Sequence, residues 1–167
     1  MLNCKINSDL DFLDKLSKNY PWIPNSLSIR PTESNIEKKI SLLNQIQDDW
    51  VETKDYIFHT IFGEKYYFNY DGKKFVQPTN FEFNIKWSFQ PSMFKYNLTN
   101  PDTNHWILWN SEQDLNWEYP EEKINHIITI KLTQHLTPNV PFQFVWYKNP
   151  KPTIPEFYHV QVFWICN

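Results

Sequence analysis

Two long segments of the chain repeat apolar residues at the spacing of an α-helix. In the first, Ser34 and Glu37 have the form of a capping box, and apolar residues recur every three or four positions as far as Gly63, which is suited to a C-terminal cap. One long helix and two abutting helices fit this segment equally well. In the second, residues 120–136 place isoleucine and leucine at helical spacing behind a proline. A shorter helix is predicted over residues 8–19.

The pattern changes to that of β-strands in the remaining segments. Aromatic residues on both sides of the Asp-Gly pair at 71–72 predict a hairpin. Apolar and polar residues alternate over 81–87, which is typical of a half-buried strand, whereas the nearly all-apolar run 105–109 predicts a central strand. Two final strands are predicted over 142–148 and 157–165, separated by a proline-containing loop.

This order of elements predicts one α+β domain over residues 1–167, with a mainly antiparallel sheet and two or three helices packed on one face. The composition supports a large core, because phenylalanine, tyrosine and tryptophan make up 18% of the residues. No internal repeat or domain linker interrupts the pattern.

The charge and the scarcity of glycine exclude several classes of function. A net charge of -3 without basic runs disfavours binding to nucleic acid or to membrane surfaces. The polar start and the short apolar runs predict an intracellular, cytoplasmic protein that does not span a membrane. With 2 glycines the chain lacks a glycine-rich phosphate loop, and its 2 cysteines, far apart, form no zinc motif. No cofactor and no metal are predicted.

Polar residues gather near the ends of the two C-terminal strands. Lys148 and Asn149 end the first, Glu156 precedes the second, and His159 lies within it, on the same face as Gln161. If the two strands pair, these polar ends can meet across the loop. His105 opens another strand and can join them. We predict a pocket formed by His105, Lys148, Asn149, Glu156 and His159, whose groups suit acid–base catalysis or binding of a small polar ligand.

Other interpretations of the same residues compete with this pocket. A histidine on a sheet face is more often a packing residue that is hydrogen-bonded in place. A metal site of His105, His159 and Glu156 is not favoured, because no local His-x-x-x-His spacing supports it. A second hypothesis is a non-catalytic interaction module in which the loop 149–155 docks a protein partner. It predicts a contiguous exposed apolar patch and no polar pocket.

Several motifs can be compared with a known family. They are the helical segment from Ile29 through Asp48, Trp50, Tyr56 and Ile57, then residues 86–89, 105–109, 146–149 and 156–160. Together they resemble the fungal N-acetylglucosamine-induced protein 1 family, a domain of unknown function, over most of the chain. That family tends to have a second histidine where this chain has Phe157, and a proline where it has Ser88. The resemblance adds weight to the candidate residues but implies no chemistry.

Overall fold

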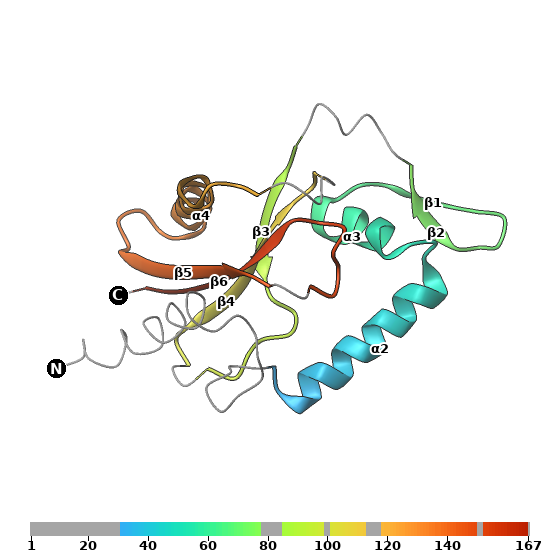
Figure 1. Ribbon diagram of the computed structural model, residues 1–167, viewed down its shortest axis with the longest axis horizontal. Helices are drawn as coiled ribbons and strands as arrows, with labels where there is room; N and C mark the ends of the chain where they lie inside the picture. The colour runs from blue at the N-terminus through green and yellow to red at the C-terminus, as the bar shows by residue number, and fades with distance from the viewer. Residues whose placement is uncertain (1–30, 78–84, 99–100, 113–117, 150–151, 167) are drawn as a thin grey trace.

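The computed structural model describes five stretches of the chain: residues 31–77, 85–98, 101–112, 118–149 and 152–166. The elements are α2 (Glu33–Asp49), α3 (Thr53–Phe62), β1 (Tyr66–Phe68), β2 (Lys74–Val76), β3 (Trp87–Pro91), β4 (Asn104–Asn110), α4 (Glu121–His135), β5 (Phe142–Lys148) and β6 (His159–Cys166). A four-stranded antiparallel sheet has the order β3-β4-β6-β5, and β1 and β2 form a separate hairpin (Figure 1). The α+β class is therefore confirmed.

The predictions of the hairpin, of the central strand and of the two C-terminal strands are confirmed, whereas β3 shares only Trp87 with the predicted strand 81–87, whose described residues 85 and 86 are not in a strand. The hairpin β1–β2 turns at residues 71–72, the run 105–109 lies within β4, and β5 spans the predicted residues. Strand β6 begins two residues later than predicted, because Phe157 packs against Phe58 of α3 instead of extending the ladder. The predicted helix at 8–19 and most of the predicted strand at 81–87 lie outside the described residues.

Helix α4 covers one face of the four-stranded sheet. Because side chains alternate along a strand, Leu108 of β4 and Val160 of β6, which are paired directly, point to this same face. The buried residues of this cluster are Leu108, Tyr119, Ile124, Ile128, Leu132, Val160, Val162 and Trp164. Six residues of this cluster, at positions 108, 124, 128, 132, 160 and 162, are completely inaccessible to solvent. This face is therefore the main hydrophobic core.

Helices α2 and α3 lie on the opposite side of the sheet from α4 (Figure 1). Trp109 and Phe157 join residues of these two helices in a second buried cluster, whose members are Ile46, Trp50, Ile57, Phe58, Val76, Trp109 and Phe157. The helices were predicted to pack on one face, so their placement differs from that prediction. The physical reason is that β4 and β6 carry large apolar side chains on both faces, and both faces must be covered.

The long helical segment is divided at Trp50. The backbone of Trp50 is extended, with φ -119° and ψ 151°, and its side chain is buried in the second cluster. Gly63 ends α3 in the left-handed conformation, as predicted. The predicted capping box is wrong by two residues, because Thr32 is the N-cap and its hydroxyl oxygen accepts a hydrogen bond from the Asn35 N–H at 3.3 Å. Ser34 is already inside the helix.

A pair of substitutions on α4 tests this packing. Ile128→Ala should lower the free energy of unfolding by roughly 2–5 kcal/mol, because it leaves a cavity in a completely buried site. Ile130→Ala is the matched control, because Ile130 is 41% exposed on the same helix, and should change stability by no more than about 0.5 kcal/mol. Urea unfolding measures both. Equal losses would contradict the assignment of the core face.

Candidate functional site

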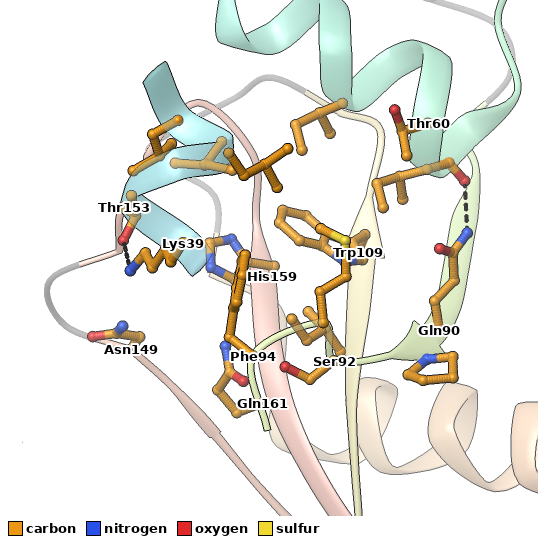
Figure 2. Close-up of a pocket in the computed structure, with 18 of the residues that line it drawn as sticks. Lys39, Thr60, Gln90, Ser92, Phe94, Trp109, Asn149, Thr153, His159 and Gln161 are labelled. Atoms are coloured by element: carbon orange, nitrogen blue, oxygen red, sulfur yellow. Dashed lines mark hydrogen bonds between the residues drawn. The ribbon is translucent and has the colours of Figure 1, made fainter. Parts of the chain in front are cut away.

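A cavity of about 190 Å³ lies between the sheet and helices α2 and α3, on the face opposite α4 (Figure 2). Most of its wall is apolar. The polar side chains labelled in Figure 2 are Lys39, Thr60, Gln90, Ser92, Asn149, Thr153, His159 and Gln161. Lys39, Asn149, Thr153 and His159 lie toward one end, and Thr60 and Gln90 toward the other. No aspartate or glutamate is among the described residues of the wall.

Strand β6 places His159 and Gln161 on the cavity face because they are two residues apart. In the ladder with β4, His159 is paired with Trp109 and Gln161 with Ile107. The His159 ring stacks on the Trp109 ring, with centroids 4.5 Å apart and an angle of 28° between the planes. Only 8% of His159 and 7% of Gln161 is exposed. Their hydrogen bonds are therefore made inside the protein or with a molecule in the cavity.

One contact determines the tautomer of His159. Its Nδ1 lies 3.0 Å from the carbonyl oxygen of Phe157. Because a carbonyl oxygen can only accept, Nδ1 must carry the hydrogen, which leaves the lone pair of the neutral ring on Nε2. Nε2 has no hydrogen-bond partner among the described residues. An imidazole held in this way can accept a hydrogen bond or a proton from a ligand.

Burial lowers the pKa of His159, because the protein interior disfavours the charged ring. The hydrogen bond to the Phe157 carbonyl acts in the opposite direction, and the positive charges of Lys148 and Lys39 lower the pKa further. His159 is therefore a neutral base at neutral pH.

His105 orients the amide of Gln161 from behind the cavity wall. The Tyr96 N–H donates to His105 Nδ1 at 3.3 Å, so the hydrogen of the neutral ring is on Nε2. That Nε2–H donates to Gln161 Oε1 at 2.6 Å. Burial lowers the pKa of His105 to about 4. With Oε1 occupied, Gln161 has its NH₂ group available as a donor, because this group has no partner among the described residues.

Lys39 supplies the positive charge of the cavity. Its Nζ donates to the hydroxyl oxygen of Thr153 at 2.5 Å, and burial lowers the pKa of the ammonium group. No carboxylate among the described residues forms an ion pair with it. Lys39 was not among the predicted site residues, although the sequence contains a pattern that points to it. Lys39 occupies a position in the apolar stripe of α2, being three, four and seven residues before Leu42, Leu43 and Ile46.

The structure brings together only part of the predicted pocket. His159 and Asn149 line the cavity, and His105 contacts it through Gln161. Lys148 does not belong to it: in the β5–β6 ladder Lys148 is paired with Val160, so its side chain points to the α4 face, away from His159. Its Nζ lies 5.3 Å from the centroid of the Tyr158 ring. Glu156 is not part of the wall either.

Comparisons with known proteins add little to this geometry. No family model matches the chain, and no curated protein matches it. A solved structure described as "Crystal Structure of HTC1" is 12% identical and has a TM-score of 0.43, over 81% of this chain and 74% of the other. A likeness of this size supports no conclusion, so the resemblance to the N-acetylglucosamine-induced protein 1 family stays a prediction.

The described residues contain neither a metal-binding cluster nor a membrane-spanning helix. No group of three or more histidine, cysteine, aspartate or glutamate side chains there is arranged to hold a metal ion. None of the helices in the described part of the chain has both the length and the apolar character that a membrane crossing needs.

The buried His105 predicts a dependence of stability on pH. Because its pKa is about 4 in the folded protein and about 6.5 in the unfolded chain, the unfolded chain binds the proton first as the pH falls. The contribution of His105 to the free energy of unfolding should therefore decrease by about 3 kcal/mol between pH 6.5 and pH 4, and level off below.

Urea unfolding of the wild type and of His105→Gln across this pH range gives the free energy of unfolding as a function of pH. The contribution of His105 is the difference between the slopes of the two proteins. His126→Gln is the control, since His126 is exposed on α4. The same slope in the wild type and in His105→Gln would contradict the neutral, buried state of His105.

Proposed function

We propose that this protein binds a small, largely apolar molecule in the cavity between the sheet and helices α2 and α3. The observation that carries the proposal is that β6 presents two polar groups without partners among the described residues, His159 Nε2 and the Gln161 NH₂ group, to a mainly apolar wall. A few oriented polar groups in a mainly apolar cavity are the usual design of a ligand site.

The volume of the cavity limits the size of the ligand. A dry apolar cavity of about 150 Å³ in another protein accepts benzene. The cavity here measures about 190 Å³, which suits a molecule of about six to ten non-hydrogen atoms. A nucleotide or a disaccharide is too large for this volume. The candidate ligands are therefore small metabolites with one polar end.

A second candidate function is a protein-interaction module. The loop 149–155 was its predicted docking segment, but the observation that favours it lies on the hairpin β1–β2. There Tyr67, Phe68 and Tyr70 are 48%, 62% and 96% exposed. Exposed aromatic side chains are common in protein interfaces. We rank this function second because it does not account for the oriented polar groups of the cavity.

A thermal-shift screen of small molecules tests the binding function. A ligand present at 100 times its Kd should stabilise the wild type by about 2.7 kcal/mol. In His159→Phe, which keeps a flat ring beside Trp109 but lacks Nε2, the same ligand should give a clearly smaller shift. His126→Phe, at an exposed position of α4, is the control and should respond as the wild type does.

A second variant keeps the test valid if His159→Phe does not fold. Leu43→Trp enlarges a side chain of the cavity wall from the side of α2, and should abolish every shift. A hit that survives in both His159→Phe and Leu43→Trp binds elsewhere and would refute the proposed site. A library of molecules of this size without a hit would refute the function.

A further inference from the structure

Among the described residues of its wall, the cavity carries one positively charged side chain and no negatively charged one. The Lys39 side chain is partly buried, and its ammonium group donates a hydrogen bond to a neutral hydroxyl, that of the exposed Thr153. The described wall contains no acidic side chain, and no carboxylate of the described residues pairs with Lys39. A partly buried cation without an anionic partner attracts an anion, because the low dielectric of the interior strengthens the interaction of charges.

The second donor of the cavity comes from Gln161. Its Oε1 accepts from His105, so its NH₂ group is the part of the amide that can bind a ligand. The Tyr96 N–H in turn holds His105 in the tautomer that donates to Gln161. Because His105 and Gln161 are both buried, the amide cannot rotate to offer its oxygen without losing the bond to His105. The backbone thus dictates that Gln161 donates.

We propose that the ligand is the anion of a small apolar carboxylic acid, with its carboxylate between Lys39 and Gln161 and its apolar part against the α2 and α3 side of the wall. This inference rests on the proposed function and names the ligand class. Two donors, one of them charged, match the two oxygens of a carboxylate, and charge-assisted hydrogen bonds of this kind are the stronger ones. The apolar remainder of the wall suits an aromatic ring or a short alkyl chain.

The carboxylate also changes the protonation of His159. In the ligand-free protein the charges that act on this ring are those of the cations Lys39 and Lys148, the latter from the other face of the sheet, and both oppose its protonation. A carboxylate beside Nε2 reverses this balance, because an adjacent negative charge stabilises the imidazolium form. The ring then takes up a proton on Nε2 and becomes a third donor to the carboxylate. Binding should therefore be accompanied by proton uptake and should weaken as the pH rises.

Isosteric pairs of probes test the charge of the ligand. Benzoate and benzamide have nearly the same shape, as do hexanoate and hexanamide, but only the first member of each pair is an anion. By calorimetry or NMR titration at pH 6, at least one carboxylate should bind the wild type roughly tenfold more tightly than its amide. Binding that is equal, or tighter for the amide, in both pairs would overturn the inference but leave the binding function intact. Absence of binding by all four would also overturn it, while the wider screen decides the function.

Variants of two neighbouring lysines identify the residue that is responsible for the preference for the carboxylate. Lys39→Met keeps most of the length of the side chain and removes the charge, so it should lower the affinity for the carboxylate much more than the affinity for the amide and thereby abolish the preference. Lys38→Met removes a charge from an exposed position on the same helix and should keep the preference. A preference that is retained in Lys39→Met would overturn the assignment of Lys39.

Proton uptake gives a readout that a change in structure alone would not produce. From pH 8 to pH 6 the affinity of the wild type for the carboxylate should rise several-fold, and calorimetry in buffers of different ionisation enthalpy should report the uptake of up to one proton. In His159→Phe both effects should disappear. An affinity that is independent of pH in the wild type would show that His159 does not contact the carboxylate, and would overturn this part of the inference.

Discussion

The burial of strand β6 on both of its faces is the constraint on which the rest of the structure depends. Seven of its eight residues are buried, and the strand is paired on both edges, with β4 and with β5. A strand that is apolar on both faces requires cover on both. Helix α4 covers one face, and α2 with α3 covers the other. The polar residues His159 and Gln161 are therefore removed from bulk water by the position of their strand, and neighbouring groups must satisfy or orient them.

The chemistry of the cavity follows from backbone groups as much as from side chains. The Phe157 carbonyl decides which nitrogen of His159 carries the hydrogen, and the Tyr96 N–H decides it for His105. The two rings consequently differ in role, although both are neutral and buried. His159 presents a lone pair at the wall of the cavity, whereas His105 uses its hydrogen to orient Gln161. The fold has placed one acceptor and one donor side by side on a single strand.

The position of α2, which forms one wall of the cavity, depends on the junction at Trp50. The Trp50 ring packs edge-on against Tyr56 and Tyr66, and the Nζ of Lys74 lies 5.6 Å from its centroid. The backbone N–H of the next residue, Val51, donates to the carbonyl oxygen of Lys74 in β2. These contacts tie the break between the helices to the hairpin β1–β2. The hairpin thus supports the wall of the cavity from outside it, which links an exposed element to the candidate site.

Local patterns in the sequence determined the helices, the strands and the alternation that puts His159 and Gln161 on one face of β6, because helix and strand periods are properties of consecutive residues. They also identified Gly63 as a cap. Only the tertiary structure decided which residues meet. The register of β5 against β6 directs the Lys148 side chain away from His159. The packing of α2 on the sheet places Lys39 in the wall of the cavity that His159 also lines. Strand register and helix placement are set by contacts between residues that are far apart in the chain. The periodicity of consecutive residues does not indicate which distant residues come into contact.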